Sequence, residues 1–151
     1  MARRWAVCGA VHRSITTTTV AGLLLPTGAC GALTGVRVEE AGGHVALVQL
    51  VRQGGMDAAW AGVLALDDDG CWGLASEADS DDVRVVVWPA GFSVADDGRL
   101  VADDGTAWTS GDAVVGAGGE HDDLRGAVGD VADACVEAGE PGLELWRAEL
   151  G

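Results

Sequence analysis

Short runs of apolar residues alternate with acidic or glycine-rich breaks along most of this 151-residue chain. Runs of about four to eight apolar and β-branched residues, bounded by Asp, Gly or Pro, are typical of β-strands. The longer runs cover residues 60–66, 71–76 and 83–88, and shorter ones cover 92–95, 99–102, 106–109, 113–115 and 143–148. The pattern predicts an all-β domain built from short antiparallel strands.

Three Asp-Asp-Gly units, which end at Gly70, Gly98 and Gly105, separate neighbouring runs. Tight hairpin turns require a positive φ angle, which Gly adopts without cost and Asp tolerates, so these units predict hairpins. Asp67 precedes the first unit, and the segment 67–70 is similar to the start of a calcium-binding loop. Such a loop alternates its ligands with spacers and ends in a Glu. Because the carboxylates here are consecutive, we interpret the segment as a turn.

Residues 116–119, with the sequence Gly-Ala-Gly-Gly, interrupt the pattern again. A phosphate-binding loop needs a parallel strand before it and a helix after it, and the P-loop also needs a Lys. The chain contains no Lys. We therefore interpret these glycines as bends in a small barrel, which end the strand predicted over 113–115.

One short helix is expected before the last strand. Residues 123–138 place Val128, Val131 and Cys135 at a spacing that favours a common helical face, although internal glycines weaken the pattern. The last strand, over 143–148, is expected to present one face made of Leu143, Leu145 and Arg147.

The start of the chain has the layout of a bacterial lipoprotein export signal. Basic residues come first, an apolar run over 20–25 follows, and the small residues Gly28 and Ala29 precede Cys30. The run is too short for a bilayer-spanning helix, which takes about 20 residues, and Thr27 stands where an aliphatic residue is usual. We expect a signal peptide over residues 1–29 and acylation of Cys30. The alternatives are conventional secretion and a start that is not a signal.

Export of this kind would leave an even pair of cysteines outside the cytoplasm. Cys8 lies in the segment that would be removed and Cys30 would carry the lipid, so Cys71 and Cys135 would remain where disulfides persist. We predict a Cys71–Cys135 disulfide. Two buried free thiols are the alternative. A zinc site is disfavoured because neither residue has a second Cys or His at ligand spacing.

Acidic residues dominate the chain after Cys30. All 24 Asp and Glu residues follow Cys30, together with six Arg residues, so this part carries a formal charge of 6 − 24 = −18. Affinity for nucleic acid comes mainly from basic side chains, so we exclude DNA and RNA as partners. A highly soluble exterior is the general interpretation of the charge. A surface that binds cations or a basic partner is the alternative.

Few residues are candidates for catalysis or metal binding. His44 and His121 are the histidines that would remain after processing, and His121 lies beside Glu120, Asp122 and Asp123. This segment could form a metal or acid–base site, although its charged context favours a solvated loop. A hydrolytic triad needs an activated nucleophile, and the chain has no Gly-x-Ser-x-Gly motif. No pair of carboxylates is singled out for glycoside cleavage, and we expect no cofactor or bound metal.

Tryptophan is abundant beside a single Phe. Five of the tryptophans lie in the predicted β-domain, at Trp60, Trp72, Trp88, Trp108 and Trp146. Most are expected in the core, because a core rich in Val and Ala needs larger side chains to fill its volume. One or two could line a groove and stack on a sugar or a peptide. Trp88, directly before Pro89, is the candidate for such an exposed position.

Several short motifs in the region 58–147 form a recognisable set. They are CWGL at 71–74, VVVWPAG at 85–91, DG at 104–105, GDAV at 111–114, GG at 118–119 and a later lone Cys135. The set resembles small exported β-domains of actinobacterial lipoproteins. The resemblance implies a small OB-like barrel, stapled by the paired cysteines, and it implies no activity. The chain departs from the pattern in its export signal and in the acidic loop 77–82.

These observations predict three segments: a signal over 1–29, a tether with a possible N-terminal strand over 30–57, and a barrel domain over 58–151. The expected fold is a small all-β, OB-like barrel with one short helix before the last strand. The expected function is that of a non-catalytic, lipid-anchored module that binds a cell-envelope partner or a small ligand. The alternatives are an envelope hydrolase or metal-dependent enzyme that uses acidic residues with His121, and a purely structural or adhesive role.

Overall fold

The computed structural model describes residues 35–55, 58–78 and 80–151. The predicted signal peptide over 1–29 and the predicted acylation site Cys30 lie outside these residues. Within the described residues, no helix has the length and apolar character needed to cross a membrane.

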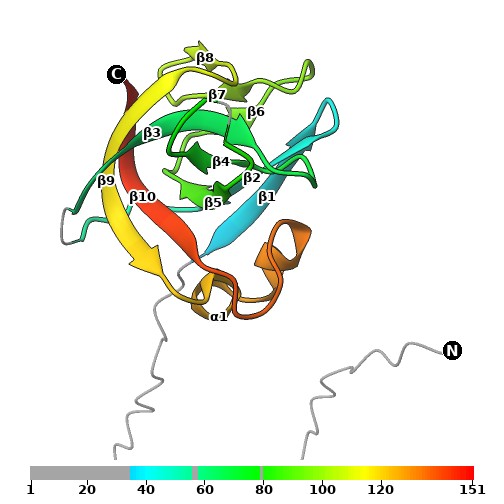
Figure 1. The fold of residues 1–151 in the computed structure, drawn as a ribbon, viewed down its shortest axis with the longest axis vertical. Helices are drawn as coiled ribbons and strands as arrows, with labels where there is room; N and C mark the ends of the chain where they lie inside the picture. The colour runs from blue at the N-terminus through cyan, green and yellow to red at the C-terminus, as the bar shows by residue number, and fades with distance from the viewer. Residues whose placement is uncertain (1–34, 56–57, 79) are drawn as a thin grey trace, which may run out of the picture. The chain divides into compact units, whose positions relative to one another are not determined.

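Five strands close into a barrel (Figure 1). They are β3 (Ala58–Leu66), β4 (Trp72–Ala75), β5 (Val83–Trp88), β9 (Ala113–His121) and β10 (Gly142–Leu150). Around the ring, β3 pairs with β4, β4 with β5, β5 with β10, β10 with β9, and β9 again with β3. The β5–β10 pairing is parallel and the other four are antiparallel. This order is that of a five-stranded, OB-like Greek-key barrel, so the predicted fold is confirmed.

A hairpin from the segment 30–57 also belongs to the folded unit. It consists of β1 (Val36–Ala41) and β2 (His44–Gln49), and β2 pairs in parallel with the end of β5. Ala46 and Val48 of β2 are fully buried in the barrel core. The folded unit therefore begins well before residue 58, where the sequence analysis places its start.

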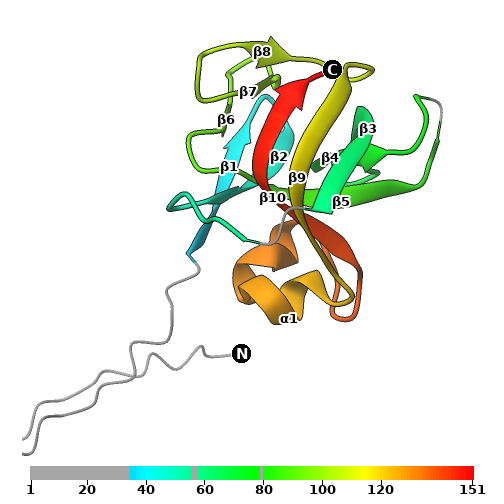
Figure 2. The same ribbon diagram turned by 90° about the vertical axis from the view of Figure 1, so that its left-hand side faces the viewer.

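The remaining short strands form a separate three-stranded sheet. They are β6 (Ser93–Val94), β7 (Leu100–Val101) and β8 (Ala107–Trp108). The Asp-Asp-Gly turns that join them contain Gly98 and Gly105 at φ angles of 83° and 86°, and Gly70 in the β3–β4 turn has a φ of 81°. The predicted hairpins are confirmed at all three turns. Figure 2 shows this small sheet and the helix α1 at opposite ends of the barrel.

Two short helical segments precede β10. The α-helix α1 covers Leu124–Val128, and the 3-10 helix η1 covers Asp130–Ala134. Gly129 separates them because its φ of 86° does not continue a helix. The side chain of Asp123 caps α1 by accepting a hydrogen bond from the Gly126 N–H. The predicted helix is confirmed, but it is much shorter than residues 123–138.

The strand β9 continues through the glycines that the sequence analysis interprets as bends. Residues 116–119 lie inside β9 and pair with β10. A Cβ atom on Gly116 would lie 2.6 Å from the carbonyl oxygen of Arg147, and one on Gly118 would collide with the carbonyl oxygen of Glu144. These glycines therefore allow a close approach of two strand backbones rather than ending a strand.

The partner strand β10 contains a bulge between Leu145 and Arg147. Leu143 and Leu145 face the barrel core as predicted, but beyond the bulge Ala148 packs against the core. Arg147 is exposed instead, so the face predicted for this strand is wrong at that position. The extra residue reverses the alternation of side chains, which is the expected effect of a bulge.

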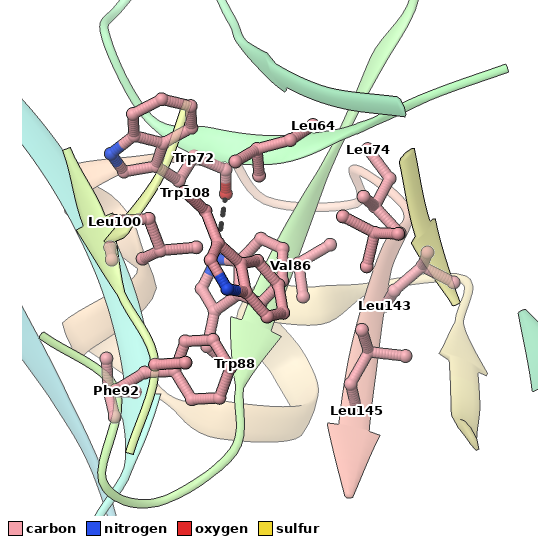
Figure 3. Packing of buried hydrophobic residues seen from close by; sticks show 14 residues of the cluster. Leu64, Trp72, Leu74, Val86, Trp88, Phe92, Leu100, Trp108, Leu143 and Leu145 are labelled. Atoms are coloured by element: carbon pink, nitrogen blue, oxygen red, sulfur yellow. Dashed lines mark hydrogen bonds between the residues drawn. The ribbon is translucent and has the colours of Figure 1, made fainter. Parts of the chain in front are cut away.

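The core fills the barrel with aliphatic and aromatic side chains from every barrel strand (Figure 3). Val86 and Trp88 of β5 point into this core, whereas Val85 and Val87 pack in a second cluster against Leu124 and the helical segments. Strand β5 is therefore buried on both faces, which explains its nearly continuous apolar sequence.

Candidate ligand-binding groove

Trp88, the predicted groove residue, lies in the centre of the core. It is 0 % exposed, and its ring stacks on Phe92 at a centroid distance of 5.6 Å and meets Trp108 edge-on at 6.1 Å. Its indole N–H donates to the carbonyl oxygen of Trp72 at 3.3 Å (Figure 3). The prediction of an exposed rim position is wrong, because β5 has neighbours on both faces. The core role expected of most tryptophans is confirmed for Trp72 and Trp108.

His121 contacts a carboxylate that the sequence analysis does not select. Its Nε2 atom lies 3.1 Å from Oε2 of Glu144, whose Oε1 atom accepts a hydrogen bond from the side chain of Gln49 at 3.0 Å. Two of the carboxylates near His121 in the sequence have other partners. Glu120 forms an ion pair with Arg84, and Asp123 caps α1. Both oxygens of Glu144 are engaged, so this group ties β2, β9 and β10 together.

The predicted disulfide between Cys71 and Cys135 is present. Cys71 directly follows the β3–β4 turn, and Cys135 directly follows η1. Their Cα atoms lie 5.7 Å apart although 64 positions separate them in the chain. The bond therefore joins the β3–β4 turn to the connection between β9 and β10.

A groove lies between these two joined segments. It has a volume of about 330 Å³ and is formed by the β3–β4 turn, the start of β5 and the residues that lead into β10. Six carboxylates line it, from Asp67, Asp68, Asp69, Asp81, Asp82 and Glu140. We call this feature the acidic groove. OB barrels bind their ligands on the second and third barrel strands, between the first–second and fourth–fifth connections. In this chain the acidic groove lies between the two equivalent connections and is lined by the start of β5, whereas no residue of β4 lines it.

Charges in the acidic groove are strongly unbalanced. Arg84 is the cation that lines it, and its guanidinium pairs at 2.6 Å with Glu120, which is not part of the groove. A neighbouring hollow shares Asp69 and Glu140 with the groove and adds Asp133 and Glu137. The arrangement concentrates negative charge on one concave surface, which attracts cations and repels anions.

One carboxylate of the groove also shapes the turn. The side chain of Asp67 accepts hydrogen bonds from the backbone N–H groups of Asp69 at 3.0 Å and Cys71 at 2.8 Å. Burial raises the pKa of Asp67 above its usual value, these two hydrogen bonds lower it, and the nearby charges of Asp69 and Asp68 raise it further. The net pKa is raised, chiefly because the turn partly buries this carboxylate.

Within the described residues, no group of three or more His, Cys, Asp or Glu side chains converges as a metal site would require. The carboxylates of the groove lie along its walls instead.

Sequence reasoning does not find the acidic groove, because its walls come from three segments that are far apart in the chain. The signal that could have found it is the OB-like topology, which brings the acidic turn 67–70 and the acidic residues near 140 to one face. No family model, curated protein or solved structure matches this chain.

Proposed function

We propose that this chain is an exported, lipid-anchored, non-catalytic barrel module that binds a positively charged segment of a cell-envelope partner in the acidic groove. One observation carries the proposal: six carboxylates line a concave surface between the two connections that flank the ligand site of OB barrels. The partner is a basic peptide segment or side chain, because the groove presents acceptors for Lys and Arg.

The physical basis is the sum of several weak ion pairs. A single exposed ion pair contributes little to affinity, because water screens it and side chains lose freedom. Several carboxylates around one groove act together, raise the local concentration of a cationic partner and speed its association. The volume of about 330 Å³ lies near the lower end of the range for small-ligand pockets, so it accommodates one or two basic side chains rather than a folded domain.

The arginines of the described residues do not compete for this role. Each of the six arginines among the described residues pairs with a carboxylate, and Arg84 pairs outside the groove. Carboxylates greatly outnumber these arginines, so most of the negative charge is left for an external cation.

The location of the protein is part of the proposal. The export signal over 1–29 and acylation of Cys30 would hold the barrel at the outer side of a membrane, within reach of other envelope proteins. The Cys71–Cys135 disulfide is compatible with such an oxidising location.

The test measures binding of a fluorescently labelled hexalysine peptide to the purified full chain at low ionic strength. Substitution of Asp68, Asp69 and Asp81 by Asn removes three exposed charges of the groove without changing side-chain size. We expect this triple variant to raise Kd by about tenfold, since each exposed ion pair contributes roughly 0.5 kcal/mol. Added salt should weaken the wild-type complex.

A matched control removes three exposed carboxylates elsewhere, through Glu40→Gln, Asp96→Asn and Asp122→Asn. This variant has the same net charge as the groove variant, so we expect less than about a threefold change in Kd. Equal losses in the two variants would show that hexalysine responds only to net charge, and the groove would then not be a binding site. A labelled hexaglutamate peptide should not bind either form.

A further inference from the structure

A second cavity opens in the barrel wall beside the acidic groove. Strand β3 has nine residues but β4 has only four, and β4 pairs with β3 no further than Val63. The first half of β3 therefore pairs with β9 on one side and lacks a β4 partner on the other. A cavity of about 210 Å³ occupies this position, beyond the end of β4 and next to the starts of β5 and β10.

The lining of this cavity is half apolar and half polar. Trp60, Leu74 and Leu143 provide the apolar part, and Ser76, Asp82 and Arg84 provide a hydroxyl, a carboxylate and a guanidinium. Figure 3 shows Leu74 and Leu143 on the same side of the core cluster. We call this feature the Trp60 cavity. It shares Asp82 and Arg84 with the acidic groove, and its remaining residues are different.

Trp60 carries an unusual unsatisfied group. Its indole Nε1 atom is buried and has no hydrogen-bond partner among the described residues. A buried Trp N–H normally finds an acceptor, because leaving the donor unpaired costs free energy. The ring packs against the core and also lines the cavity, so a ligand bound there lies next to this indole.

The chemistry of the lining selects a class of ligand. The indole N–H requires an acceptor, which an ammonium group does not provide, and Asp82 requires a donor. Arg84 already pairs with Glu120, so the local charge does not favour an anion. Hydroxyl groups both donate and accept, and the C–H face of a sugar ring packs on an aromatic ring.

We propose that the Trp60 cavity binds a neutral sugar ring. The indole ring and the two leucines contact the C–H face of the sugar, and an oxygen substituent of the sugar accepts a hydrogen bond from the indole N–H. Ser76, Asp82 and Arg84 bind the other hydroxyl groups. This inference does not depend on the basic partner proposed for the acidic groove, because it rests on the Trp60 ring and on a different opening in the barrel.

The experiment follows the indole N–H signals of the ¹⁵N-labelled full chain by NMR, since each tryptophan contributes one signal. The Trp60→Phe variant identifies the Trp60 signal by its loss. On titration with glucose, galactose and N-acetylglucosamine, we expect at least one sugar to move the Trp60 signal saturably, with a Kd on the order of 1 mM. Asp82→Asn should weaken that binding by about tenfold, because a hydrogen bond to a charged group is lost.

The chain contains a matched internal control. The indole N–H of Trp146 is also buried and has no partner in the described part of the chain, but the hollow beside it measures only about 60 Å³. Its signal should remain unchanged, and Asp68→Asn in the acidic groove should not alter sugar binding. The proposal is overturned if no sugar produces a saturable shift, if the Trp60 and Trp146 signals move together, or if alanine, a zwitterion, shifts the Trp60 signal and the sugars do not.

Discussion

At the scale of single residues, Gly118 is the glycine of β9 with the least room for a side chain, because the backbone of β10 lies directly beside it. A Cβ atom at this position would collide with the carbonyl oxygen of Glu144. The same carbonyl belongs to the residue that holds Gln49 and His121, so a shift of β10 would disturb that group as well. The neighbouring Gly119 is different, because a Cβ there would meet only the Trp146 ring at an ordinary distance of 3.8 Å.

We therefore predict that Gly118→Ala lowers the free energy of unfolding by about 1–3 kcal/mol, the usual cost of inserting a methyl group where there is no room. Gly119→Ala should change it by less than about 0.5 kcal/mol. Urea denaturation of both variants measures the difference. Equal effects of the two substitutions would contradict the close approach described for Gly118.

At the scale of elements, α1 and η1 depend on contacts with the barrel. Each has five residues, which is too short for a helix that is stable by itself. Leu124, Ala132 and Val136 pack against the outer face of β5, and the disulfide ties the end of η1 to the start of β4. The barrel thus holds the helical segments in place, and Cys135, which directly follows η1, lines the acidic groove.

We predict that the double variant Cys71→Ser, Cys135→Ser loses about 4 kcal/mol of stability, the chain-entropy value for a loop of this length. Hydrogen exchange should become faster for the amides of α1 and η1, and hexalysine binding should weaken because one wall of the groove is released. Adding a reductant to the wild-type protein should reproduce these losses, and adding it to the double variant should have no effect. An unchanged unfolding midpoint in the double variant would contradict the proposed role of the bond.

At the scale of the whole molecule, the barrel has an apolar core and a surface on which acidic residues outnumber basic ones. The part of the chain after Cys30 carries a formal charge of 6 − 24 = −18, so the long-range field of the domain is negative. A negative field favours basic partners over nucleic acid or anionic headgroups. If Cys30 is acylated as proposed, this charge would repel an anionic membrane and favour a barrel held away from the lipid surface.

Membrane attachment is predicted to depend on Cys30. In the native host, Cys30→Ala should move the protein from the membrane fraction to the medium or the soluble envelope fraction, because the acylated side chain is absent. Cys8→Ala is the matched control and should leave fractionation unchanged, since Cys8 belongs to the segment expected to be removed. Cell fractionation with immunoblotting measures both. If the Cys30→Ala protein stays in the membrane fraction, lipid anchoring is wrong.

The sequence by itself determined the strands and turns from Ala58 to Trp108, because Asp-Gly pairs and short apolar runs act over a few neighbouring residues. Strand Val83–Trp88 is predicted with its observed bounds. Counting cysteines after the expected processing also identified the Cys71–Cys135 pair. Between residues 116 and 150 local patterns were less reliable, since glycines that allow a close approach look the same in sequence as glycines that bend a chain.

Only the tertiary structure decided which faces are buried and which loops meet. Trp88 is buried because β5 has three neighbouring strands and is covered on both faces, and the nearly continuous apolar run of β5 is the single local sign of this. The acidic groove and the Trp60 cavity exist because barrel closure brings distant segments together and because β4 ends early. Pairing over such separations depends on the whole set of contacts in the fold, which no short stretch of sequence contains.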